Sequence, residues 1–192
     1  DGKPVYEIGD FAFRCNRLLS NVRIPDTVVC VGDNAFVSCL NLQEVRLSSQ
    51  LKHILNWVFC DCPSLEAVHA DAYAVYDING VLYARDDGYV DLYRYPPVRK
   101  AAETFVIPDG VERIYDGALQ DVGSIKNIVV PSTVRVLRRG VLGQNGCFAG
   151  MDAPVNLIFK HSDPKFISAY ADGRGVFHEL PTGSTITVKN ES

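Results

Sequence analysis

The cysteines and histidines are the side chains of this chain most able to bind a metal ion or to act as nucleophiles. The 192 residues include six cysteines and four histidines. A structural zinc site usually takes its four ligands from two closely spaced pairs. Cys60 and Cys62 form one close pair, but no second pair accompanies it. The histidines show no ligand spacing either; they are His53, His69, His161 and His178. We therefore predict no metal site.

Catalytic and cofactor motifs are also absent from the sequence. It contains no G-x-S-x-G, H-E-x-x-H or phosphate-binding P-loop. The glycine-rich stretch Gly143–Gly150 lacks the pattern of a nucleotide-binding loop, and we expect it to pack within a repeat. Asp86, Asp87 and Asp91 lack the spacing of a calcium-binding loop, so we expect a solvated turn there. The sequence thus predicts a protein that is not an enzyme and needs no cofactor.

The composition excludes further classes of partner. The net charge is −4, and no run of lysine and arginine could follow a phosphate backbone, so we expect no nucleic-acid partner. No stretch approaches the 18 or so apolar residues of a membrane span, so we expect no membrane insertion by this chain. With 47% hydrophobic residues, the chain can bury a substantial core.

A 23-residue repeat organises most of the chain. Phe13, Phe36 and Phe59 follow one another at this interval. The same interval relates other apolar positions, in the sets Leu19, Leu42, Leu65 and Val22, Val45, Val68, and it resumes at Leu119 and Leu142. One repeat of this length cannot bury its own apolar face, so neighbouring repeats must stack.

Each repeat combines two kinds of local structure. Val22-x-Ile24 alternates with period two, which predicts a short strand. The three-residue spacing before it predicts a helical turn or a 3₁₀ segment. Residues Asp10, Asp33, Asn56 and Asp116 precede these segments and are expected to cap them, whereas Arg139 breaks that series. Stacked at about 4.8 Å per strand, such repeats build a parallel sheet along a solenoid.

The repeat resembles a known family. The stretches "VGDNAFVSCLNLQEVRL" (31–47), "IPDGVERI" (107–114) and "VPSTVRVL" (130–137) resemble the BspA-type, or Treponema pallidum-type, leucine-rich repeats of bacterial surface proteins. The resemblance covers about residues 5–70 and 105–154. It implies a fold of about five repeats and an extracellular or cell-surface protein that adheres to or binds a partner.

One slot of the repeat holds asparagine or cysteine, as leucine-rich repeats do. It contains Asn16, Cys39, Cys62 and Asn145. The polar group of this slot meets backbone groups inside the coil. We therefore expect Cys39 and Cys62 to be buried free thiols rather than partners in a disulfide.

The domain organisation follows from where the period holds. We expect repeats over 1–70, the first of them incomplete, a hairpin insertion over 71–104, repeats over 105–154 and a strand–helix–strand cap over 155–192. The strand that would precede Val5 is missing, so we expect an open edge that a longer chain or a partner covers. The cap is expected to hold a helix over Pro164–Ala171 and a strand over Thr185–Val188.

The insertion is rich in tyrosine and is expected to form a hairpin around Asp86-Asp87-Gly88. Tyr83, Tyr89, Tyr93 and Tyr95 lie in it, and tyrosine is favoured at interfaces. Two interpretations stay open: these rings pack the hairpin onto the solenoid, or they form a binding patch.

The concave face of the solenoid is the second candidate surface. The residue between the two inward-facing strand residues should point to that face, which places Arg23, Arg46 and His69 in one column with Glu44 beside it. Either this column is a solvated ladder of charges or it forms a groove that attracts anions. We expect a recognition module that binds a protein or a glycan, including a host extracellular ligand. The alternative is a structural spacer in a longer surface protein. The oligomeric state is left open.

Overall fold

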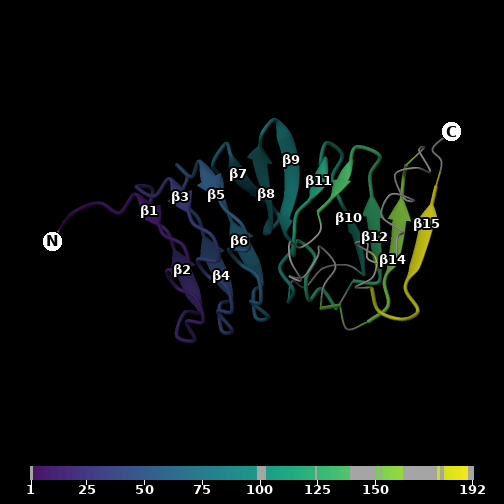
Figure 1. Ribbon diagram of the computed structural model, residues 1–192, viewed down its shortest axis with the longest axis horizontal. Coiled ribbons are helices and arrows are strands. Elements are labelled where there is room, and N and C mark those ends of the chain that lie inside the picture. The colour runs from purple at the N-terminus through teal and green to yellow at the C-terminus, as the bar shows by residue number, and fades with distance from the viewer. Residues whose placement is uncertain are drawn as a thin grey trace.

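The protein is a stack of coils with two rows of short strands along its length (Figure 1). The computed structural model describes residues 2–98, 103–123, 125–138, 150–151, 153–161, 177 and 180–189. The predicted repeat solenoid with short parallel strands is confirmed. Within the described ranges, no helix is long and apolar enough to cross a membrane.

The lower row in Figure 1 holds the strands that the period-two pattern of the repeats predicted, together with two strands in the region expected to be the cap. They are β2 (Asn21–Arg23), β4 (Glu44–Arg46), β6 (Ala67–His69), β10 (Thr104–Val106), β12 (Asn127–Val130), β14 (Asn156–Phe159) and β15 (Thr185–Val188). Within it, β2, β4 and β6 form one parallel sheet, and β10, β12, β14 and β15 form another. The predicted last strand at Thr185–Val188 is thereby confirmed.

The upper row holds the second strand of each coil and the insertion. Its strands are β1 (Glu7–Ile8), β3 (Cys30–Val31), β5 (His53–Ile54), β7 (Val75–Ile78), β8 (Val81–Asp86), β9 (Tyr89–Arg94), β11 (Arg113–Ile114) and β13 (Val136–Leu137). Here β1, β3 and β5 pair in parallel, and a second sheet runs in the order β13-β11-β9-β8-β7.

The predicted repeat register holds in the core. Val22, Val45 and Val68 pair across β2, β4 and β6, each one repeat from the next. The ring of Phe36 has no exposed surface and stacks between Phe13 at 5.0 Å and Phe59 at 5.7 Å, measured between ring centroids. A fully buried, stacked ring such as that of Phe36 contributes both apolar burial and a specific ring contact.

The segments that we expected to be helical are series of tight turns instead. Ala12 N–H donates to the carbonyl of Gly9 within its own coil, whereas Phe13 N–H donates to the carbonyl of Ala35 in the next coil. Left-handed backbone recurs in these turns, at Phe11, Cys15, Asn34, Ser38, Trp57 and Asp61. Because alternate N–H groups bond to the neighbouring coil, a continuous helical hydrogen-bond pattern cannot form.

Three of the expected capping residues, Asp10, Asp33 and Asn56, act between coils rather than within their own turn, which corrects our expectation for them. Asp10 Oδ1 accepts a hydrogen bond from Asp33 N–H at 2.8 Å, and Asp33 Oδ1 accepts one from Asn56 N–H at 2.7 Å. Asn56 Oδ1 in turn accepts a hydrogen bond from the hydroxyl of Tyr115. A Cβ at Gly32 would lie 2.5 Å from Asp10 Oδ1, so this position must stay glycine for the ladder to form.

The cysteine slot is confirmed as a pair of buried free thiols. Cys39 Sγ donates to the carbonyl of Phe13 at 3.1 Å, and Cys62 Sγ donates to that of Phe36 at 3.2 Å. Burial raises the pKa of Cys62 to about 12. Asn16 fills its slot differently, because its Oδ1 accepts the N–H groups of the two leucines that follow at positions 18 and 19.

The insertion is a three-stranded meander rather than a single hairpin. The expected hairpin of β8 and β9 is present, and β7 pairs antiparallel with β8. Asn79-Gly80 and Asp87-Gly88 form the two turns, all four residues with positive φ, as in two-residue hairpins of the mirror-image turn type. At the other side β9 pairs in parallel with β11.

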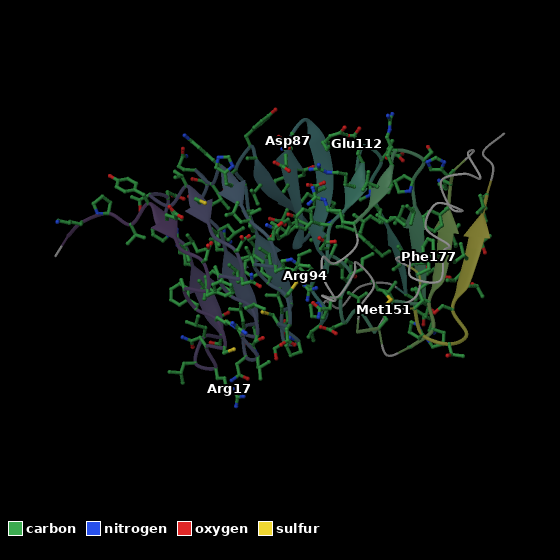
Figure 2. All side chains as sticks on the ribbon, in the orientation of Figure 1. Arg17, Asp87, Arg94, Glu112, Met151 and Phe177 are labelled. Atoms are coloured by element: carbon green, nitrogen blue, oxygen red, sulfur yellow. The ribbon has the colours of Figure 1, made fainter. Side chains whose placement is uncertain are left out.

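The coils that carry β1 to β6 form a first array, and those that carry β10 to β14 form a second. Arg94, at the end of β9, fastens the insertion to the second array. It is buried and lies in the middle of the stack (Figure 2). Its Nη1 donates to the carbonyls of Gly117 at 2.6 Å and Gln120 at 3.3 Å. The meander is therefore part of the stack and joins its two halves.

Several expectations lie outside the described residues. They are the helix at Pro164–Ala171, the part of the glycine-rich stretch over residues 143–149, the repeat positions Leu142 and Asn145, and the break in the capping series at Arg139.

We expect Phe36→Ala to lower the free energy of unfolding by about 3–5 kcal/mol, because it opens a cavity in the middle of the ring stack. Urea unfolding measures the loss. Leu18→Ala is the control, since Leu18 is 92% exposed and its truncation should change stability by less than about 0.5 kcal/mol. A loss below about 1 kcal/mol for Phe36→Ala would contradict the stacking.

We expect a thiol reagent at about pH 8 to label exposed Cys15 in the native protein and to leave Cys39, Cys60 and Cys62 unmodified. Burial raises the pKa values of Cys60 and Cys62 to about 12, so almost no thiolate is present to react. Peptide mapping by mass spectrometry identifies the labelled residues, and unfolding in urea should expose the three buried thiols. Native labelling of Cys39 or Cys62 as fast as that of Cys15 would overturn this assignment.

Candidate functional site

The lower row brings together the four residues predicted for the concave face. Arg23, Arg46 and His69 stand in register on β2, β4 and β6. Both arginines are exposed and His69 is half-buried. His69 Nε2 lies 3.6 Å from Glu44 Oε1. The stacking of identical repeat positions is sufficient to place this column.

The column borders a hollow of about 500 Å³ whose charge is not purely positive. Arg23 and Arg46 line it together with three carboxylates, Asp26, Asp71 and Asp77. Asp77 Oδ1 also lies 3.9 Å from His69 Nδ1. Hydrogen bonds from the backbone and side chain of Ser49 lower the pKa of Asp26, so this carboxylate is ionised at neutral pH. The surface therefore presents both signs of charge, unlike the anion-attracting groove that the column alone indicated.

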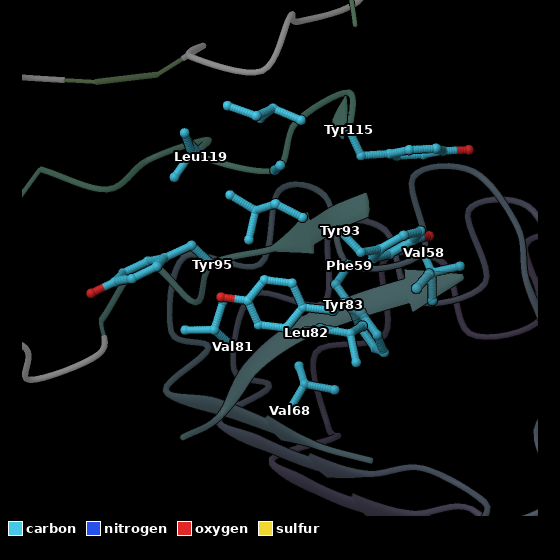
Figure 3. Packing of buried hydrophobic residues seen from close by; sticks show 14 of the residues in the cluster. Val58, Phe59, Val68, Val81, Leu82, Tyr83, Tyr93, Tyr95, Tyr115 and Leu119 are labelled. Atoms are coloured by element: carbon cyan, nitrogen blue, oxygen red, sulfur yellow. The ribbon is translucent and has the colours of Figure 1, made fainter. Parts of the chain in front are cut away.

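Three of the four predicted hairpin tyrosines are core residues, which corrects their assignment to a binding patch. Tyr83, Tyr93 and Tyr95 are 1%, 5% and 0% exposed. Figure 3 shows them among the buried apolar side chains, including Phe59 of the first array. Of the set, Tyr89 alone is exposed, at 42%. The packing interpretation therefore holds for the other three rings.

A charged cluster lies on the upper row, and it corrects the expected solvated turn, because Asp91 is only 1% exposed. Arg113 binds Asp91 with two parallel hydrogen bonds, from Nε to Oδ1 and, at 2.8 Å, from Nη2 to Oδ2. Its Nη2 also bonds to Asp86 Oδ2 at 3.1 Å. Burial raises the pKa of Asp91, against the opposing effect of Arg113, and the hydrogen bond to Asp91 raises the pKa of Arg113. The pair is nearly buried and is held by geometry specific to arginine.

Arginine–tyrosine contacts surround this pair. The guanidinium carbon of Arg138 lies 4.5 Å from the centroid of the Tyr115 ring, and that of Arg85 lies 4.1 Å from the centroid of Tyr76. Tyr115 stacks on Tyr93 at 5.0 Å. Arg85, Tyr93, Tyr115 and Arg138 border a second hollow between β5 and the meander, of about 270 Å³, which we call the wedge.

The described residues contain no group of three or more histidine, cysteine or acidic side chains that could hold a metal ion. Cys30 pairs in register with His53, which could suggest an activated thiol. Burial and the nearby carboxylates of Glu7, Asp10 and Asp33 raise the pKa of Cys30, so its reactive thiolate form is disfavoured.

Comparison with known proteins agrees with the repeat architecture. The family model of the BspA-type leucine-rich repeat region matches residues 3–80 and 99–160 in six copies. No curated protein matches the chain.

Solved structures of leucine-rich repeat proteins are similar to the chain at low identity. A leucine-rich cell surface protein of Faecalibacterium prausnitzii is 17% identical, with 98% of this chain and 84% of that chain covered and a TM-score of 0.42. The Treponema pallidum leucine-rich repeat protein is 21% identical, with 97% and 69% covered and a TM-score of 0.40. A leucine-rich repeat protein of Bacteroides ovatus is 17% identical, with 95% and 43% covered and a TM-score of 0.50. The last of these supports the fold alone.

We expect Arg113→Met to lower the free energy of unfolding by about 3–5 kcal/mol, because it leaves the Asp91 carboxylate buried without its partner. The double change Asp91→Leu with Arg113→Met should lose much less, since no unpaired charge remains. Urea unfolding of both variants is the measurement.

The exposed Lys126–Glu103 pair is the matched control for this test. Lys126→Met should cost less than about 1 kcal/mol, because solvent screens that pair. If Arg113→Met cost no more than Lys126→Met, the buried pair would not contribute as inferred.

Proposed function

Because the chain belongs to the BspA-type leucine-rich repeat family, we propose that it is a non-enzymatic recognition module of a bacterial cell-surface or secreted protein. Its ligand is a protein or a glycan, and the contact surface is the face of β2, β4 and β6 that carries Arg23, Arg46 and His69. The exposed column of Arg23 and Arg46 beside the 500 Å³ hollow is the observation that carries this proposal.

Packing does not dictate the residues of that face, and this supports a role in recognition. On each of the three strands the central valine faces the core, and the residues on either side are more exposed. A core position accepts only apolar residues of similar volume, whereas an outward position can vary freely. The arginines here make no ion pair within 4.0 Å among the described residues, so both are available to a ligand.

The mixed charge of the hollow indicates the kind of ligand. Two arginines and three carboxylates can donate and accept hydrogen bonds within one surface. A ligand rich in hydroxyl or amide groups, such as a glycan or a polar protein loop, matches such a surface better than a polyanion does. The arginines then contribute to the rate of association, and the carboxylates contribute to specificity.

We expect the double change Arg23→Ala with Arg46→Ala to slow association with a ligand by about tenfold, because it removes the two charges that steer encounter. Surface plasmon resonance against purified extracellular matrix proteins and a glycan array identifies the ligand and then measures the variant at two salt concentrations. The difference between wild type and variant should shrink at high salt, since exposed charges are screened within about 8–10 Å.

The control is Arg14→Ala with Arg17→Ala, which removes two exposed arginines from the turn segments and keeps the net charge equal to that of the test variant. It should bind as wild type does. Loss of binding in Tyr89→Ala with none in the Arg23 and Arg46 variant would move the site to the meander. Wild-type protein that binds no matrix protein and no glycan would favour the alternative of a structural spacer.

A further inference from the structure

The wedge between β5 and the meander carries a positive charge on a chain whose net charge is −4. Its two carboxylates, Asp86 and Asp91, both bind Arg113. Lys52, Arg85 and Arg138 also line it, and no ion pair within 4.0 Å involves them among the described residues. Three positive and two negative side chains thus line the wedge, a net charge of +1, and Arg113, outside the lining, binds both carboxylates.

Aromatic rings, rather than carboxylates, hold two of these cations in place. Arg85 lies over Tyr76 at 4.1 Å and over Tyr73 at 5.0 Å, and its Nη1 donates to the carbonyl of Tyr73. Arg138 lies over Tyr115 at 4.5 Å. A guanidinium stacked on a ring keeps its N–H edges available for a planar acceptor. The arginines are therefore positioned before any ligand arrives.

The hydroxyls of the two tyrosines that line the wedge are already engaged. Tyr115 donates to Asn56 Oδ1 and Tyr93 donates to the carbonyl of Leu55. The carboxylate of Asp91 is taken up by Arg113. The groups left to meet a ligand are thus mainly the donors of Lys52, Arg85 and Arg138. Three cationic donors, beside carboxylates that Arg113 binds, suit a group that only accepts, namely an ionised carboxylate or a sulfate.

The size and walls of the wedge limit what carries that group. Its volume of about 270 Å³ lies just below the range of about 300–1,000 Å³ typical of small-ligand pockets. The small side chains of Ala74 and Ala84 form part of its wall. This space is suited to a single ring rather than a folded chain.

We propose that the wedge binds one acidic sugar residue through its carboxylate or sulfate group, held by Arg85, Arg138 and Lys52. This site is separate from the lower-row surface and does not depend on it, because the two hollows share no lining residue.

Isothermal titration calorimetry at low salt tests the proposal with glucuronate, glucose 6-sulfate, glucose, inorganic sulfate and a glutamyl dipeptide as probes. We expect glucuronate or glucose 6-sulfate to bind and glucose not to bind. Arg85→Gln with Arg138→Gln should weaken binding at least tenfold, and Lys52→Gln should weaken it less. Arg23→Gln with Arg46→Gln, on the lower row, should leave the affinity unchanged.

Each other outcome overturns part or all of the proposal. Inorganic sulfate that binds as tightly as the acidic sugars would reduce the wedge to a simple anion site. Binding of the dipeptide alone would make the ligand an acidic peptide. No binding by any acidic probe would remove the site altogether. Because Lys52 is exposed, Lys52→Gln should fold normally and remains informative if the arginine variant does not fold.

Discussion

Polar groups of each coil form hydrogen bonds with a neighbouring coil, and the rest of the structure depends on these bonds. The thiol of Cys62 bonds to the carbonyl of Phe36, Asp10 bonds to the N–H of Asp33, and Asp33 bonds to that of Asn56. A buried polar group left without a partner costs about 1–3 kcal/mol, so a coil shifted by one residue would lose several such bonds together. In the coils before the insertion, the fixed period of 23 residues keeps these donors opposite their acceptors.

The elements that depend on the period could be predicted from the sequence, whereas those that depend on backbone conformation could not. Alternation around Val22 and Val45 predicted the strands and their register. The turn segments were expected to be helical because a three-residue spacing is common to helices and to consecutive turns. Only the left-handed backbone at residues such as Phe11 and Trp57 separates the two, and neither residue type signals it. Asn79-Gly80, in contrast, carried a recognisable turn signal that the sequence analysis missed.

The two candidate sites differ in the same way: the position of one follows from the repeat, and that of the other does not. The column of Arg23, Arg46 and His69 follows from the repeat, so its position was predictable. The wedge combines His53 and Asn56 of the first array with Arg85 of the meander and Tyr115 of the second array. Asn56 and Tyr115 are 59 residues apart, an interval unrelated to the period. The number of tyrosines drew attention to the insertion, but it could not show whether each ring is packed or exposed. Tyrosine has an apolar ring and a polar end, so it suits both environments.

The insertion determines both surfaces, because it interrupts a repeat that alone would give only a uniform ladder. Asp77, in β7, reaches the lower-row hollow, while Arg85 and Asp91, in β8 and β9, line the wedge. The parallel pairing of β9 with β11 and the buried Arg94 fix the meander to the second array. An array of the same coils without this insertion would keep the arginine column but lose Asp71 and Asp77 beside it, along with the wedge. The repeat thus supplies the scaffold, and the one segment that departs from it supplies most of the chemical variety at which a ligand could be recognised.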